Sequence, residues 1–189
     1  MVKWIIIGIV VVLIIAIIGW FIGCYNKLVK SRNKVRNSWS QIDVQLKRRF
    51  DLIPNLVSTV KGYAAHENSI LEEFAKARNV YSQASSSGDV AEMSKANNML
   101  SSTLSRLIAV SEAYPELKAD KHFTELMGEL SKTEDKIAYT RQFYNDVVMT
   151  HNNLIEVFPG SIVASMFGFK QENFFEADDA SRENVKVQF

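Results

Sequence analysis

Residues 4–26, WIIIGIVVVLIIAIIGWFIGCYN, carry no charged side chain, and a basic segment follows them at once. An uncharged run of about 23 residues is long enough to cross the roughly 30 Å hydrocarbon core of a bilayer as a helix. Its Ile and Val content suits lipid on all sides, where a helix satisfies its own backbone hydrogen bonds. The sequence therefore predicts a transmembrane anchor, residues 1–24, that holds the rest of the chain at a membrane.

Two other readings of this segment remain open. A cleaved signal peptide has an apolar region of about 7–15 residues and an A-x-A-like site, whereas this run is longer and lacks that site. Cys24 follows Gly23, as the modified cysteine of a bacterial lipoprotein follows a small residue, although the usual Leu further upstream is missing. The alternative is thus a lipid anchor at Cys24 with an extracytoplasmic domain. As the single cysteine, Cys24 forms no internal disulfide.

The charges beside the span predict its orientation. Residues 25–50 hold eight Lys and Arg against Asp43 alone, and only Lys3 precedes the span. The positive-inside rule then places the amino terminus outside and the following domain in the cytoplasm, here of a bacterial inner membrane. Residues 51–189 sum to about −7, which argues against nucleic acid as a partner. Anionic lipid is a possible partner of the flanking basic residues, Lys27, Lys30, Arg32, Lys34 and Arg36.

The rest of the chain is patterned as long helices, since the whole sequence of 189 residues holds only 3 Pro and 8 Gly. From Leu28 onward, apolar residues recur at alternating steps of three and four. Because this register continues past residue 60, it does not show where the first helix ends. That end has to be predicted from helix-breaking residues. We favour Asp51–Pro54, where Asp51 would cap a new helix and Pro54 would sit in its first turn. The alternative break is Gly62–Asn68.

Later boundaries are clearer. A turn at Ser85–Gly88 precedes Asp89, which is expected to cap a third helix that ends before Pro115. Asp120 is expected to cap a fourth helix, closed by Phe158–Gly160. We therefore predict an all-α fold: a single transmembrane helix, a long up-and-down four-helix bundle over residues 25–160, and an ordered tail packed on it over 161–189. The tail is expected to contain a short helix near 161–167 and an extended segment at 185–189.

Two sets of polar residues recur at helical spacing and are candidate sites. Charged residues on the apolar seams are expected to pair across helices and fix the register, with Glu134 or Glu67 facing Arg32, Arg49 or Arg78. A run of asparagines forms either a surface for self-association or a partner, or hydrogen bonds within the bundle. The seam charges are Arg32, Arg49, Glu67, Arg78, Glu134 and Arg141, and the candidate interaction face is Asn26, Asn33, Asn37, Asn145 and Asn152.

No motif for catalysis or metal binding stands out. His66-Glu67 resembles the start of a zinc helix, but position 70, where the second histidine would stand, is Ile70. His122 and His151 lie on the fourth predicted helix, away from His66 and without neighbouring Cys or paired carboxylates. We expect no catalytic residue, no metal ligand and no cofactor.

Several strings nevertheless resemble the LemA family over essentially the whole chain. They are Tyr25-Asn26-x-Leu28-Val29, Trp39 to Arg49, Asp51 to Val57, Gly62-Tyr63-Ala64, His66-Glu67, Tyr114-Pro115-x-Leu117-Lys118-Ala119, Glu134 to Ile137, Arg141-x-x-Tyr144-Asn145, Phe158-Pro159 and Phe174-Phe175-Glu176. Phe50 departs from the pattern, where a smaller residue is expected.

The resemblance implies an amino-terminally anchored helical-bundle protein of bacterial membranes, without an established enzymatic activity. It also implies a possible link to membrane metalloproteases of the HtpX type, and relatives in magnetosome membranes. We expect a non-enzymatic scaffold or adaptor for membrane proteins that acts as an oligomer. The alternatives are a membrane-shaping protein that binds anionic lipid and a metal-binding bundle.

Overall fold

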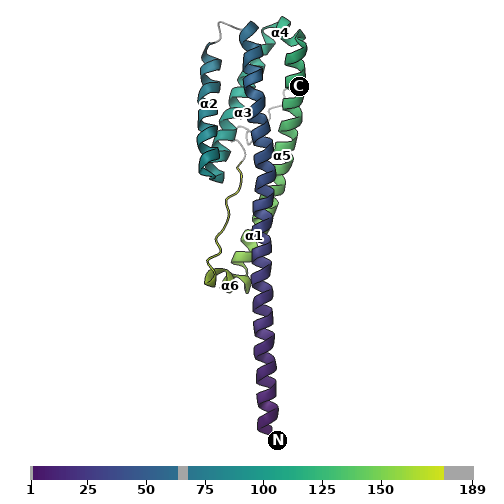
Figure 1. Cartoon of the computed structure of the whole chain (residues 1–189), viewed down its shortest axis with the longest axis vertical. Helices are drawn as coiled ribbons and strands as arrows, with labels where there is room; N and C mark the ends of the chain where they lie inside the picture. The colour runs from purple at the N-terminus through teal and green to yellow at the C-terminus, as the bar shows by residue number, and fades with distance from the viewer. Residues whose placement is uncertain (1, 64–67, 177–189) are drawn as a thin grey trace, which may run out of the picture. The chain divides into compact units, whose positions relative to one another are not determined.

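The chain is all-α in the computed structural model, which describes residues 2–63 and 68–176 (Figure 1). Of these residues 89% are helical, and no strand occurs among them. The all-α prediction is therefore confirmed. The helices in order are α1 (Val2–Tyr63), α2 (Asn68–Ser87), α3 (Val90–Glu112), α4 (Pro115–Ala119), α5 (Lys121–Glu156) and α6 (Gly160–Met166).

Helix α1 continues past the break that we favoured. Pro54 lies inside the helix, and α1 ends at Tyr63, so the break at Asp51–Pro54 is wrong and the alternative at Gly62–Asn68 agrees with the structure. An internal proline removes one backbone hydrogen bond and costs about 3 kcal/mol. Continuing the helix buries Ile53, Leu56 and Val60 on one side, and this burial offsets the cost.

The amino-terminal part of α1 exposes its apolar side chains. An 18-residue window has a mean hydropathy of 3.3 with none of it buried, and no other helix among the described residues is long and apolar enough to cross a membrane. The exposed stretch runs from Val2 to Trp20 and includes Trp4. The predicted span is thus present as a continuous helix with an apolar surface on all sides.

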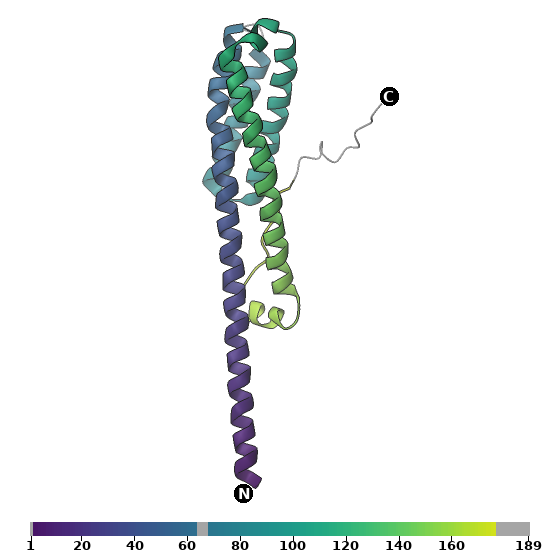
Figure 2. The same ribbon diagram turned by 90° about the vertical axis from the view of Figure 1, so that its right-hand side faces the viewer.

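Residues 2–39 and 144–172 form one compact unit, which we call the first unit. It pairs part of α1 with the end of α5 and with α6, which lies beside α1 in both side views (Figures 1 and 2). One cluster of its core contains Leu28, Val163 and Ala164, surrounded by partly buried apolar side chains, and Val35, Tyr144 and Val148 are also buried in this unit. The expected short tail helix near 161–167 is confirmed as α6.

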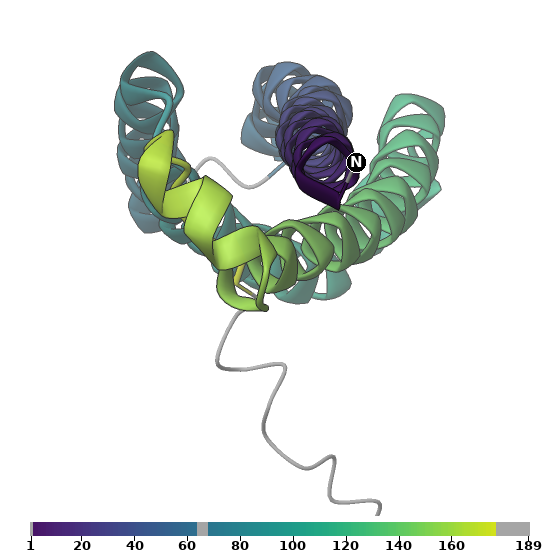
Figure 3. The same cartoon turned by 90° about the horizontal axis from the view of Figure 1, so that it is seen from below.

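The second unit contains residues 40–143 and 173–176 of the described chain. Viewed along the helices, the last part of α1 lies between α2 and the beginning of α5 (Figure 3). Helices α2 and α3 pack against each other and are joined at Gly88, whose φ of 68° is readily adopted by glycine. The core includes Ile42, Leu46, Phe74, Ala77, Leu100, Leu107, Leu117, Phe123 and Leu130.

The predicted caps of two helices are confirmed. The Asp89 carboxylate accepts hydrogen bonds from the backbone N–H groups of Ala91 and Glu92, at 2.7 and 3.1 Å, and so begins α3. The Asp120 carboxylate accepts one from the N–H of Phe123 at 2.9 Å. The sequence did not predict α4, where Pro115 occupies the first position of a separate short helix. The expected extended segment at 185–189 lies outside the described residues.

Candidate functional site

Arg49 on α1 is the largest fully buried side chain among the described residues, with 1% of its surface exposed. Its Nη1 donates to the Asn97 side-chain oxygen at 2.6 Å, and its Nη2 donates to the Ser101 hydroxyl at 2.9 Å, both on α3. Its Nε lies 2.9 Å from Oε1 of Glu134 on α5. The N–H direction of that contact does not meet hydrogen-bond geometry, although the separation is that of an ion pair, so we attribute it to charge attraction.

This network contains one of the pairs of seam charges that the sequence allowed, Arg49 with Glu134. Burial lowers the pKa of Arg49, and the Glu134 carboxylate opposes that shift. Burial also raises the pKa of Glu134, against the attraction of Arg49 and Arg141. Glu134 remains 40% exposed, so water still solvates part of the pair. Because the partners lie on α1, α3 and α5, the network joins three helices, which is a structural role.

The other seam charges behave differently. The guanidinium of Arg78 lies 5.1 Å from the ring centre of Phe50, which stacks on Tyr81 at 4.6 Å. Arg32 lies 5.0 Å from the ring centre of Phe169. Both arginines therefore contact aromatic faces, an arrangement known to stabilise cations. Glu67 lies outside the described residues, as does His66.

The asparagines of the candidate interaction face do not share one environment. Asn26 and Asn33 are exposed on α1. Asn152 binds the backbone of Glu172 with both ends of its amide: Nδ2 donates to the carbonyl at 3.0 Å, and Oδ1 accepts from the N–H at 2.9 Å. It therefore fastens the segment after α6 onto α5. Asn37 and Asn145 also interact within the protein.

The histidines of the described chain do not gather into a metal site. His151 is fully buried, and its Nδ1 lies 3.2 Å from the Ser31 hydroxyl. Burial lowers its pKa, as does Arg32, while Glu172 and the backbone of Lys170 oppose the shift. His122 is exposed on α5. Among residues 2–63 and 68–176, no group of three or more His, Cys, Asp or Glu is placed to hold a metal ion.

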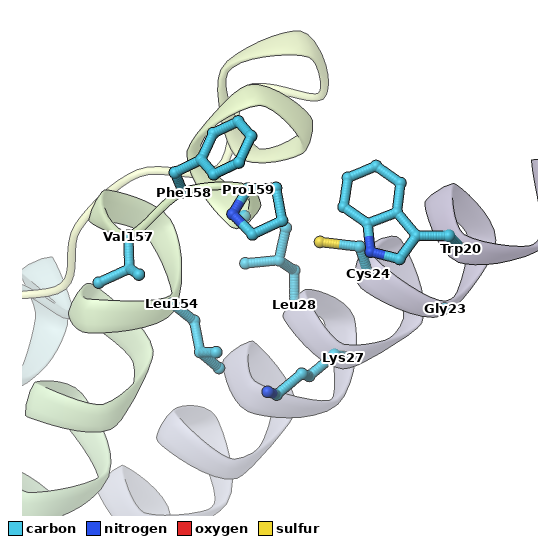
Figure 4. A pocket seen from close by; sticks show the side chains of 10 residues that line it. Trp20, Gly23, Cys24, Lys27, Leu28, Leu154, Val157, Phe158 and Pro159 are labelled. Atoms are coloured by element: carbon cyan, nitrogen blue, oxygen red, sulfur yellow. The ribbon is translucent and has the colours of Figure 1, made fainter. Parts of the chain in front are cut away.

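A cavity of about 410 Å³ lies in the first unit, beside the carboxyl end of the apolar stretch. Figure 4 shows Trp20, Cys24 and Lys27 on one wall, with the Cys24 thiol pointing toward Pro159. Nearly all of the wall is apolar, and its charged group is the Lys27 ammonium. The full lining is Trp20, Gly23, Cys24, Lys27, Leu28, Leu154, Val157, Phe158, Pro159 and Gly160.

A second, more polar hollow of about 510 Å³ shares three of these residues, Gly23, Lys27 and Leu154. Lys30 and Lys34 join Lys27 along it, one helical turn apart. Three of the five flanking basic residues thus border one groove, while Arg32 contacts Phe169 and Arg36 makes another interaction within the protein. The lysines could be picked out from the sequence, but the cavity could not. One wall of the cavity comes from α1 and the other from residues 154–160, which are far away in the sequence.

Comparison with known proteins shows the family of the chain. The model of the LemA family matches residues 38–189. The chain is 28% identical over 167 residues to Protein LemA of Metamycoplasma hominis, covering 87% of this chain and 74% of that protein. It is 25% identical over 190 residues to Magnetosome protein MamQ of Magnetospirillum gryphiswaldense, covering 88% and 70%. With its exposed apolar helix, the protein is a membrane-associated helical protein, and the chain belongs to the LemA family.

Proposed function

We propose that this protein is a non-enzymatic, single-span membrane protein whose helical body acts as a scaffold or adaptor for other membrane proteins. The observation that carries the proposal is the continuity of α1, which extends from the exposed apolar stretch to Tyr63 without interruption. A partner bound to the body would therefore be held at the bilayer. We further propose that the second unit is an up-and-down four-helix bundle made by α1, α2, α3 and α5.

The orientation belongs to the same proposal. Lys27, Lys30 and Lys34 follow the span directly, so the positive-inside rule favours an external amino terminus and a cytoplasmic body. Alkylation of a cysteine introduced at exposed Glu112, in a Cys24→Ala background, tests this. We expect a membrane-impermeant maleimide to label it in inverted vesicles but not in intact spheroplasts.

Crosslinking in native membranes tests the scaffold role. A photoreactive amino acid at Asn33, on the exposed part of the asparagine face, is compared with one at Ser105, which is exposed on α3. We expect adducts from Asn33 with a second copy or with another membrane protein, such as a metalloprotease of the HtpX type. Recovery of monomer alone from both positions would contradict the proposal.

A second candidate function is the binding of anionic lipid. It is favoured by the apolar cavity beside Trp20 and by the groove that Lys27, Lys30 and Lys34 border. An acyl chain matches the first surface, and a phosphate group matches the second. Lipids that remain with the protein after detergent extraction are measured for the wild type and for the triple Lys→Gln variant. Enrichment of phosphatidylglycerol over phosphatidylethanolamine with the wild type only is the expected result, and equal retention would contradict this function.

A further inference from the structure

The turn from α5 into α6 and α6 itself, residues 157–167, expose apolar side chains that the protein does not cover. Phe158 is 75% exposed and Met166 is 66% exposed. Val157, Ile162 and Phe167 are exposed as well. No charged residue occurs from Val157 to Phe169. We call residues 157–167 the corner.

One side of the corner is already packed within the first unit. Val163 and Ala164 are buried against Leu28 of α1. Ile162 and Met166, four residues apart, share a different face of the helix and are exposed. Helix α6 therefore has an inner apolar face, which is packed against α1, and an outer apolar face, which is exposed.

Aromatic contacts fix the depth of the corner relative to the apolar stretch of α1. The Phe167 ring lies 5.8 Å from the ring of Phe21 and 4.7 Å from that of Tyr25, measured between ring centres. Phe21 lies six residues before Lys27, which is about 9 Å along a helix with a rise of 1.5 Å per residue. If Lys27 lies at the level of the lipid phosphates, Phe21 lies about 9 Å deeper and Tyr25 about 3 Å deeper, so Phe167, which contacts both rings, lies about 3–9 Å deeper. Interfacial helices bury their apolar faces by about 5–10 Å.

We propose that the corner is a second membrane contact, inserted into the interface of the bilayer that α1 spans. The inference rests on the proposed span. Helix α6 has only seven residues, too few to cross a bilayer, so it lies in the interface with Phe158, Ile162 and Met166 toward the acyl chains. The outer face of the corner is continuous with the apolar surface of α1 through Phe21 and Phe167, and the lysines that follow the span face the phosphates. Lipid is therefore the occupant that the charges and the continuity both favour.

Spin labels in the full-length protein test the depth directly. In a Cys24→Ala background, single cysteines at Phe158, Ile162 and Met166 carry a nitroxide, and the protein is reconstituted in phosphatidylcholine–phosphatidylglycerol vesicles. Collision with oxygen, which concentrates in lipid, is compared with collision with a water-soluble nickel chelate. Val12 is the control within the span, and Asp146, exposed on α5, is the control in water. Circular dichroism confirms that each labelled protein keeps its helical content.

We expect the oxygen-to-nickel ratio at all three corner positions to be several-fold higher than at Asp146 and to approach that at Val12. A ratio equal to that at Asp146, with Val12 still in lipid, would overturn the inference and leave the span intact. Protection from both reagents would show that protein covers the corner, and it would also overturn the inference. Exposure of Val12 to nickel would instead refute the span, and with it both proposals.

Discussion

Replacing Arg49 by alanine should destabilise the second unit far more than the same change at its neighbour Arg48. The Arg49 side chain is 1% exposed, whereas that of Arg48 is 45% exposed and pairs with Glu129 at the surface. Removing Arg49 leaves a cavity and takes hydrogen-bond donors from Asn97, which is itself 3% exposed, and from Ser101. An unsatisfied buried polar group costs about 1–3 kcal/mol, and breaking a buried charged network costs about 3–5 kcal/mol.

The partners of Arg49 should rank by their burial. Asn97→Ala removes the 2.6 Å acceptor from a guanidinium that stays buried, which should cost about 1–3 kcal/mol. Glu134→Gln should cost about 1 kcal/mol or less, because the carboxylate is 40% exposed and its attraction is screened by water. The expected order of destabilisation is therefore Arg49→Ala, then Asn97→Ala, then Glu134→Gln.

Urea unfolding of the full-length protein in detergent micelles, followed by far-ultraviolet circular dichroism, measures these effects. With a urea dependence of about 1–3 kcal/mol per molar, a loss of 3 kcal/mol lowers the midpoint by about 1–3 M. Arg48→Ala is the matched control, and its midpoint should hardly move. If Arg49→Ala shifts the midpoint no further than Arg48→Ala does, Arg49 does not fix the helix register as we reason.

Three further outcomes are expected. Asp89→Ala removes the cap of α3 and should cost about 1 kcal/mol in the same urea assay, whereas Asp89→Asn should retain most of the stability. Burial lowers the pKa of His151 in the folded protein. Its contribution to stability is therefore complete above about pH 6.5, the pKa of an unperturbed histidine, and is lost as the pH falls from that value toward the lower pKa of the folded state. The acid-induced loss, at most about 1.4 kcal/mol per pH unit, should disappear in His151→Gln. Asn152→Ala removes both bonds to the Glu172 backbone, and hydrogen exchange at that amide should accelerate roughly 5–30-fold.

Much of the helical pattern could be predicted from local sequence signals. Asp89 and Asp120 cap helices as their side chains indicate, because capping depends on residues only two or three positions away. Pro54 shows the limit of such signals. A proline is a breaker by its own chemistry, but burial along α1 outweighs its cost, and that burial is decided by helices far along the chain.

The prediction of the candidate sites depended still more on residues that are distant in the sequence. Glu134 was one of two acidic seam residues that could face an arginine, and the choice of Arg49 follows from how α1 and α5 pack. Asn152 belonged to a repeated asparagine pattern, yet its partner is the backbone of an irregular segment twenty residues away. No local signal indicates such a partner. The cavity beside Trp20 was missed for the same reason, since its two walls are separated by more than a hundred residues.

The corner leaves much of its apolar surface exposed when the protein is considered in water. The cluster beneath the corner buries Leu28, Val163 and Ala164, whereas the corner itself exposes five large apolar side chains. Apolar burial is the main favourable term in folding, so the exposed outer face of the corner contributes little to stability in water. Insertion of the corner into lipid would remove the outer face from water and add the missing term. The membrane then stabilises the first unit in addition to anchoring it, and α6 should exchange its amide hydrogens faster in a mild detergent than in a bilayer.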